Sequence, residues 1–134
     1  PRSTQGVSSA ASDVYKRQPL DLYFKTVVAL CRIIMPNSNI QIPPNLSPDS
    51  YQEFLSVGIN DWGGISPITS DYVNPECGWP EINTVEENCK KLNFQLKARF
   101  PVYPEFFPLV DNNLKQKLSL IADTDNYVKE DYWR

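Results

Sequence analysis

The sequence contains no histidine, and this absence removes several kinds of active site from consideration. Histidine is the side chain best suited to acid and base chemistry near neutral pH, and it is the commonest metal ligand in proteins. A Ser-His-Asp hydrolase and a histidine-ligated zinc site are therefore excluded as interpretations of these residues.

Cysteine is scarce and is not arranged in pairs. Cys31, Cys77 and Cys89 are odd in number and have unrelated spacings. Neither a disulfide framework nor a C-x-x-C metal knuckle is visible in this pattern. We interpret the thiols as reduced, as expected of a cytoplasmic protein.

Long apolar runs and an excess of positive charge are also missing. A membrane span needs about 18 consecutive apolar residues, whereas the strongest candidate, Val27 to Met35, contains Arg32 and stops at Pro36. With 134 residues and a net charge of -3, the chain lacks the basic footprint of a nucleic-acid-binding protein. We expect one domain that binds a small molecule and has neither a membrane nor a nucleic acid as its partner.

Residues 1–18 differ in composition from the rest. They are rich in Ser and Ala, lack an initiator Met and an apolar h-region, and show no helical or strand period. The run from Val7 to Gln18 resembles the translated sequencing-adapter tail found at the ends of assembled environmental reading frames. A natural transit peptide is the alternative interpretation, based on the serine enrichment and on Arg2, Lys16 and Arg17, and a plastid location is expected if the source is a photosynthetic eukaryote. We expect a disordered, non-native tail at 1–18 and the native sequence in 19–134, and under either interpretation 1–18 takes no part in the predicted fold.

From Pro19 onward, segments with helical spacing alternate with segments typical of strands. The predicted helices are 22–33, 47–58, 80–92 and 114–121, and the predicted strands are 39–42, 59–62 and 94–100. Gly58 is expected to end the second helix as its C′ residue, and the tail that follows the last helix is expected to be loosely held. The first helix is expected to be buried over much of its circumference, because its apolar positions recur at spacings of three and four: Leu22, Thr26, Ala29, Leu30 and Ile33.

Alternation of this kind predicts an α/β fold with parallel strands. A closed (β/α) barrel takes about 250 residues, so this chain is too short to close one. Because the start of the chain lacks Met and resembles an adapter, we expect 19–134 to be an incomplete barrel rather than a whole one. An open three-stranded α/β domain is the structural alternative.

In either layout the carboxyl ends of the strands form the binding site. These ends are Pro43–Asn45, Asp61–Gly64 and Arg99–Pro101, and they are expected to converge. The two glycines allow a ligand to approach the bare backbone, although a glycine pair after a strand is also typical of a plain turn. Arg99 is interpreted either as the partner of Asp61 or as a clamp for a substrate carboxylate.

Taken together, three stretches resemble a known family. Gly58-Ile-Asn-Asp-Trp-Gly-Gly-Ile-Ser-Pro and its continuation to Pro80, with 39–46 upstream and 99–105 downstream, resemble the C-terminal half of a radical SAM synthase. That family makes 7,8-didemethyl-8-hydroxy-5-deazariboflavin (FO), and the similarity is to its CofG subunit or domain. Trp62 and the following Ile-Ser-Pro favour this branch, because the CofH-type partner and menaquinone-pathway relatives carry an Asn-Asp-Leu-Gly-Gly-Thr type of sequence here.

The resemblance implies a radical lyase on a TIM-type barrel. Such enzymes use a 4Fe-4S cluster and S-adenosylmethionine, and form the deazaflavin chromophore from a tyrosine-derived ribityl-aminouracil adduct. The C-x3-C-x2-C cluster motif of the family is absent from the sequence, so we expect this chain alone to be inactive. A CofH-type subunit or fused domain is the implied partner. By analogy, the residues expected to contact cofactor or substrate are Asn45, Asn60, Asp61, Trp62, Gly63, Gly64, Arg99, Tyr103 and Glu105.

Two other hypotheses are compatible with the sequence. One is a self-contained, non-catalytic α/β module whose Gly-Gly loop binds a small anionic ligand. The other is a different barrel enzyme, a lyase that uses the carboxylates of Asp61 and Glu105.

Overall fold

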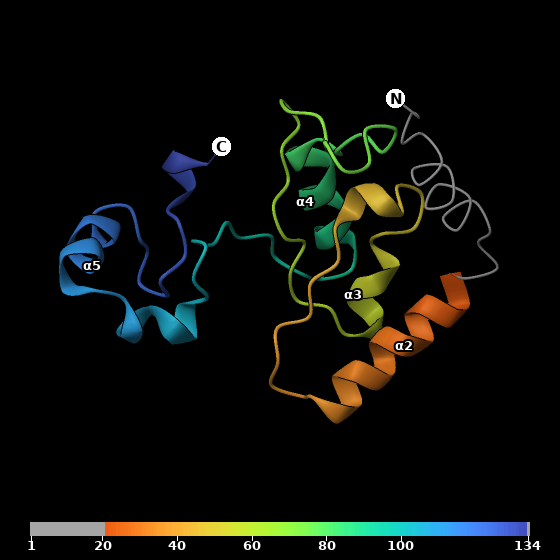
Figure 1. Ribbon diagram of the computed structural model, residues 1–134, viewed down its shortest axis with the longest axis horizontal. Coiled ribbons are helices and arrows are strands. Elements are labelled where there is room, and N and C mark those ends of the chain that lie inside the picture. The colour runs from red at the N-terminus through yellow and green to blue at the C-terminus, as the bar shows by residue number, and fades with distance from the viewer. Residues whose placement is uncertain (1–20, 134) are drawn as a thin grey trace, which may run out of the picture. The chain divides into compact units, whose positions relative to one another are not determined.

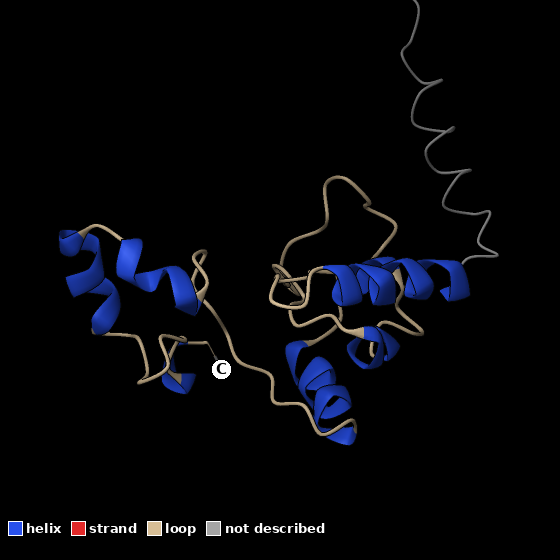
Figure 2. Ribbon diagram, turned by 90° about the horizontal axis from the view of Figure 1, so that it is seen from below, coloured by secondary structure: helices blue, strands red, loops and turns tan. Residues whose placement is uncertain are grey.

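The computed structural model describes residues 21–133, so the prediction for the tail at 1–18 lies outside the described residues. The contacts divide the chain into two units, residues 1–88 and residues 89–134. Figure 1 labels the helices, and Figure 2 shows that helices and loops make up the described part of the chain. Among the described helices, none has the length and apolar character needed to cross a lipid bilayer.

The first helix, α2, spans Asp21–Ile34, close to its predicted bounds. The prediction that α2 is buried over much of its circumference is wrong, because only one side of the helix is buried. Leu22, Leu30 and Ile33 are 78%, 51% and 73% exposed, whereas Val28 is 4% exposed. The reason is that α2 packs against α3 through the other side of its surface, where the Phe24 ring meets the Phe54 ring edge to face at 5.1 Å.

The second helix, α3, spans Glu53–Val57 and ends as predicted at Gly58, whose φ of 116° is left-handed. The chain begins to turn earlier, since the N–H of Tyr51 donates to the carbonyl of Ser47 at 2.8 Å. The apolar side of this segment faces the core, where Tyr51, Phe54 and Leu55 are all buried. Glycine is required at position 58, because a Cβ there would lie 2.7 Å from Cβ and Cγ of Arg32.

Two segments predicted as strands, 39–42 and 59–62, run parallel and are bridged at Gln41 and Asp61. The N–H of Ile42 donates to the carbonyl of Asp61 at 3.1 Å, and the N–H of Asn60 donates to the carbonyl of Ile40 at 3.2 Å. This is the slanted bonding pattern of parallel strands, limited to one bridge. Both segments leave the bridge at the same edge, where the 3₁₀-helix η1 (Pro44–Leu46) follows the first segment and the Gly-Gly pair follows the second.

The core of the first unit lies between α2, α3, the parallel pair and the start of α4, which spans Ile82–Lys91. Phe54 and Val85 are fully buried, and Trp62 packs edge to face on Tyr51 at 5.4 Å. The side-chain amide of Asn88 donates to the hydroxyl of Tyr51 at 2.8 Å, so this buried hydroxyl has a hydrogen-bond partner. Each fully buried large apolar side chain contributes about 1.5–3 kcal/mol.

The second unit contains the 3₁₀-helices η2 (Pro104–Leu109) and η3 (Glu130–Tyr132) and the helix α5 (Asn112–Ser119). The carboxylate of Asp111 caps α5 by accepting from the N–H groups of Asn113 and Leu114. Phe100 and Phe107 are its buried aromatic pair, with ring centroids 6.0 Å apart.

Two predictions for this unit differ from the structure. Segment 94–100 was predicted as a strand but is irregular, and it is tied to the C-terminal segment by a backbone bond from the N–H of Val128 to the carbonyl of Ala98 at 2.8 Å. The C-terminal tail was expected to be loose but is tied down. Ala122 and Val128 form an antiparallel bridge, and Lys129 donates through its N–H to the carbonyl of Ile121 at 2.9 Å. The alternating sequence of 94–100 lacks, within 21–133, the neighbouring strand that would complete a ladder.

Candidate functional site

The common edge at which 39–42 and 59–62 end carries the candidate site. It begins at Asn45 in η1, which is fully buried although its side chain is polar. The amide nitrogen of Asn45 donates to the carboxylate of Asp71 at 2.8 Å and to the carbonyl of Cys77 at 3.3 Å. Its amide oxygen is buried without a hydrogen-bond partner among the described residues. Asn45 therefore joins the first parallel segment to the loop that follows the second one.

Asp71 organises that loop. One of its carboxylate oxygens accepts from the N–H groups of Val73 at 2.8 Å and Asn74 at 3.1 Å, and the other accepts from Asn45. These hydrogen bonds hold the pKa of Asp71 below its ordinary value, and the bond from the Val73 N–H has the largest effect. The side chain is therefore a carboxylate at neutral pH.

A cavity of about 210 Å³ lies within the same loop. Thr69, Ser70, Asp71 and Cys77 contribute polar groups to it, and Trp79 contributes an aromatic wall. Burial raises the pKa of the Cys77 thiol, and the charges of Glu76 and Asp71 raise it further, so this thiol stays protonated near neutral pH.

Asp71, Asn74 and Cys77 were not predicted from the sequence to be site residues. A signal was present, because an Asp whose carboxylate accepts from the N–H groups two and three residues later is a common turn motif. That motif predicts a local turn only. The pairing with Asn45, 26 residues away, depends on the tertiary structure.

Asp61, Gly63 and Gly64 lie together at the end of the second segment, as predicted. The carboxylate of Asp61 accepts from the N–H of Gly63 at 2.6 Å. Gly63 has a φ of 74°, and a Cβ there would lie 2.3 Å from Nε2 of Gln41. An added Cβ at Gly64 would meet no atom within 4 Å, so Gly64 is the glycine that borders open space. Because the Gly63 N–H already binds a carboxylate, an anion would meet negative charge here rather than free donors.

Asn60 and Trp62 are held by the fold. The amide oxygen of Asn60 accepts from the N–H of Ile40 at 2.8 Å and from the guanidinium of Arg32 at 3.2 Å. Arg32 also donates to the carbonyls of Gly58, Pro36 and Ser38, each at 2.7–2.8 Å. Trp62 is 6% exposed and contacts Tyr51. Both side chains therefore have structural partners.

Arg99, Tyr103 and Glu105 belong to the second unit. The guanidinium of Arg99 lies over the ring of Tyr103 at 4.4 Å and donates to the carbonyl of Phe100 at 2.9 Å. Glu105 lies in the first turn of η2. The structure therefore brings Arg99 and Tyr103 together.

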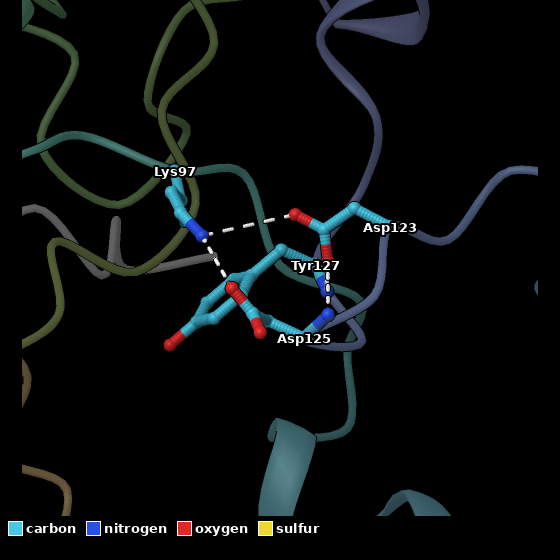
Figure 3. Close-up of polar contacts among 4 residues, drawn as sticks. All are labelled: Lys97, Asp123, Asp125 and Tyr127. Atoms are coloured by element: carbon cyan, nitrogen blue, oxygen red, sulfur yellow. Dashed lines mark hydrogen bonds and ion pairs between the residues drawn. The ribbon is translucent and has the colours of Figure 1, made fainter.

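The same unit holds a charged cluster that the sequence analysis did not identify (Figure 3). Lys97 donates to the carboxylate of Asp125 at 3.0 Å, lies 3.8 Å from that of Asp123, and stacks over the Tyr127 ring at 4.9 Å. The bond to Asp125 raises the pKa of Lys97. Asp123 in turn accepts from the N–H groups of Asp125 and Tyr127. Because Lys97 of segment 94–100 contacts both carboxylates of the later loop, the cluster is best explained as the element that anchors this segment.

The cysteines do not fit an iron–sulfur cluster. Cys31 is on α2, Cys77 is in the loop and Cys89 is on α4. Within 21–133 the structure contains no group of three or more Cys, His, Asp or Glu side chains that could hold a metal ion. A 4Fe-4S cluster of the expected kind therefore has no ligand set in the described residues.

The two parallel segments, joined by one bridge, thus end at a common edge that carries polar residues and glycines. Comparison with known proteins then identifies the family. A synthase from Methanopyrus kandleri is 47% identical over 113 residues, which are 83% of this chain and 33% of that protein. Relatives from Methanocaldococcus jannaschii and Methanothermobacter thermautotrophicus are each 44% identical, over 67% and 68% of this chain. All are named 7,8-didemethyl-8-hydroxy-5-deazariboflavin synthase, and the chain belongs to this family.

The chain spans a third or less of the length of these relatives. No protein-family model and no solved structure matches it.

Proposed function

We propose that the chain forms part of the ligand-binding wall of a radical SAM synthase that makes the deazaflavin chromophore from a tyrosine-derived ribityl-aminouracil adduct. The observation that carries this proposal is the 47% identity over 113 residues to a named FO synthase. The expected setting is a (β/α) barrel, to which 39–42 and 59–62 would contribute neighbouring parallel strands.

The chemistry of the edge is compatible with such ligands. Asp61 and Asp71 present carboxylate oxygens there, and Asn45 contributes a buried amide. Carboxylates accept hydrogen bonds from hydroxyl and amino groups, which both a ribityl chain and S-adenosylmethionine carry. S-adenosylmethionine, when bound, would supply the radical that removes a hydrogen atom from the substrate. The residues of this chain would bind and orient the ligands.

The cluster would be held by other parts of a complete synthase, because the described cysteines do not form a site for it. The reaction therefore requires polypeptide in addition to this chain, and a CofH-type partner would supply the adduct.

A chimera tests the proposal. The segment of the Methanopyrus kandleri synthase that matches this chain is replaced by the corresponding 113 residues. The chimera is reconstituted with iron and sulfide and assayed, with a CofH-type partner, for the fluorescent deazaflavin. We expect product within about tenfold of the parent, which corresponds to about 1.4 kcal/mol in the barrier.

The control replaces the same segment and carries Asp61→Asn. We expect this variant to bind the cluster and to lose most product formation. A folded, cluster-loaded chimera that cleaves S-adenosylmethionine but makes no deazaflavin would show that the proposed substrate is wrong.

A further inference from the structure

The loop between the second parallel segment and α4, which we call the 65–79 loop, has no anchor in the core. None of its residues is buried. Ile68, Tyr72 and Val73 are 85–95% exposed, although they are its large apolar side chains. A segment that buries so little apolar surface opens at a small cost in free energy. Contacts other than apolar packing therefore keep this loop in place.

One side chain ties the 65–79 loop to other segments. In the described part of the chain, both hydrogen bonds that make this connection come from the amide nitrogen of Asn45, to the Asp71 carboxylate at 2.8 Å and to the Cys77 carbonyl at 3.3 Å. Reversing the amide would place its oxygen against these two acceptors, so its orientation is fixed. The bond to the carboxylate is charge-assisted and is the stronger of the two.

The 65–79 loop is ordered from within. Its own residues line the cavity of about 210 Å³. The N–H groups that close its turns, each bonded to a group two or three residues earlier, are those of Thr69, Val73, Asn74 and Cys77. Near its two ends, Gly64 and Gly78 have no atom within 4 Å of an added Cβ. A compact loop of this kind can move as a unit about its small residues.

The loop runs across the edge that carries the candidate site. It leaves the second parallel segment at Gly64, and Asn45 holds it at the end of the first segment. Asn45 is fully buried, and its Oδ1 atom has no hydrogen-bond partner among the described residues. A buried acceptor without a partner is unfavourable, and opening of the loop lets water reach it. The closed position is therefore only moderately favoured.

We infer that the 65–79 loop is a hinged cover of this edge and that Asn45 is the positioning residue that holds it closed. Opening admits or releases a ligand, and closure keeps water away from it. That the edge takes a ligand rests on the function proposed above, whereas the hold of Asn45 on the loop does not.

Hydrogen exchange of the 134-residue chain, followed by NMR between 0 and about 1 M urea, tests the hold of Asn45. The N–H groups of Val73, Asn74 and Cys77 report on the loop, and that of Ile42 reports on the parallel pair. We expect loop exchange to be independent of urea, because local opening exposes little surface, and Ile42 exchange to accelerate with urea. Asn45→Ala should speed loop exchange about tenfold, since it removes two hydrogen bonds.

Asn83→Ala is the matched control, because Asn83 is exposed on α4, and it should leave loop exchange unchanged. Asn45 is fully buried, so a second variant guards against misfolding. Asp71→Asn keeps an oxygen for the N–H groups of Val73 and Asn74 but turns an amino group toward Asn45. It should give the same acceleration.

The chimera described above, loaded with its cluster and kept without reductant, tests the cover itself. Saturating S-adenosylmethionine should slow exchange of the loop N–H groups about tenfold or more, because the closed loop retains the ligand. Asn45→Ala should weaken this protection.

Loop exchange with the same urea dependence as that of Ile42 would overturn the inference, because the loop would then open only when the whole unit unfolds. So would folded Asn45→Ala and Asp71→Asn variants that exchange like the parent, or bound S-adenosylmethionine that leaves loop exchange unchanged. The measurement on the chain needs neither ligand nor turnover, so it stands even where the chimera makes no deazaflavin.

Discussion

Gly63 and Gly64 are adjacent in sequence, but the structure gives them different requirements. Gly63 adopts a positive φ and approaches Gln41 closely, whereas Gly64 has open space where a side chain would be. Glycine is therefore needed at position 63 for backbone conformation, and at position 64 only if a ligand occupies that space.

Alanine substitutions should separate these two roles. Gly63→Ala is expected to lower the free energy of unfolding by about 1–2 kcal/mol, the cost of a left-handed residue with a Cβ. Gly64→Ala should leave the free energy of unfolding within about 0.5 kcal/mol of the parent. Urea denaturation measures both. In the chimera, Gly64→Ala should reduce product formation although it leaves the free energy of unfolding nearly unchanged. If Gly63→Ala and Gly64→Ala lowered the free energy of unfolding equally, this assignment would be contradicted.

The carboxylate of Asp71 makes the free energy of unfolding depend on pH under acidic conditions. Its pKa is below the ordinary value of 3.8 in the folded chain, chiefly because the Val73 N–H donates to it. The unfolded state therefore binds the proton more readily. The contribution of Asp71 is complete above pH 3.8 and is lost as the pH falls through the lower folded pKa.

We expect the urea midpoint to fall between about pH 5 and pH 2 by more in the parent than in Asp71→Asn, which cannot titrate. Ser70→Ala, at the exposed neighbouring position, should keep the dependence of the parent. A parent and an Asp71→Asn variant with parallel pH profiles would contradict the role given to this carboxylate.

The ends of the helices could be predicted from the sequence better than the faces that they bury. The ends of α2 and α3 follow from Pro36 and Gly58, which act locally on the backbone. The buried face of α2 could not be predicted, because several apolar residues lie on each side of this helix and a hydrophobic period does not say which side finds a neighbour. Segment 94–100 failed as a strand because pairing depends on residues distant in sequence.

The candidate site was predicted in part for the same reason. Asn45, Asp61 and the glycines could be proposed because they follow strand-like segments, and they do lie at the common edge of the parallel pair. Asp71 was missed because its partner, Asn45, comes 26 positions earlier. The fixed positions of Asn60 and Trp62 depend on Arg32 and Tyr51, which no local pattern connects to them.

Arg32 should contribute more to stability than the other charged residue of the α2 interior. It donates to three carbonyls and to Asn60, whereas Lys25 pairs with Glu53, a side chain that is 57% exposed. Arg32→Met should lower the free energy of unfolding by about 1.5–3 kcal/mol, because it removes charge-assisted bonds to several acceptors. Lys25→Met, the matched control, should cost about 0–1 kcal/mol.

Thermal and urea unfolding monitored by circular dichroism compare the two variants. Similar losses would show that the guanidinium contacts contribute little. Arg32→Lys is expected to resemble Arg32→Met, since one ammonium cannot reproduce the planar fork that reaches several acceptors at once.

At the scale of the whole molecule, the chain is expected not to assemble a cluster by itself. Its cysteines lie on α2, in the loop and on α4, and no three-ligand group exists in 21–133. Anaerobic reconstitution of the 134-residue chain with iron and sulfide should give no stable iron–sulfur absorbance in the visible range after desalting. The chimera, treated in parallel, should retain it. A stable cluster on the chain that is lost in a Cys77→Ser variant would contradict this expectation.

The contacts of Arg32 lie at the end of the parallel pair where 39–42 and 59–62 begin, whereas the polar residues and Gly64 lie where the two segments finish. Under the proposed function, the contacts that fix strand spacing and the residues that would meet a ligand lie at different ends of the parallel pair. Substitutions at the Gly64 end would then alter ligand preference and substitutions at the Arg32 end would alter stability, with little interference between the two sets.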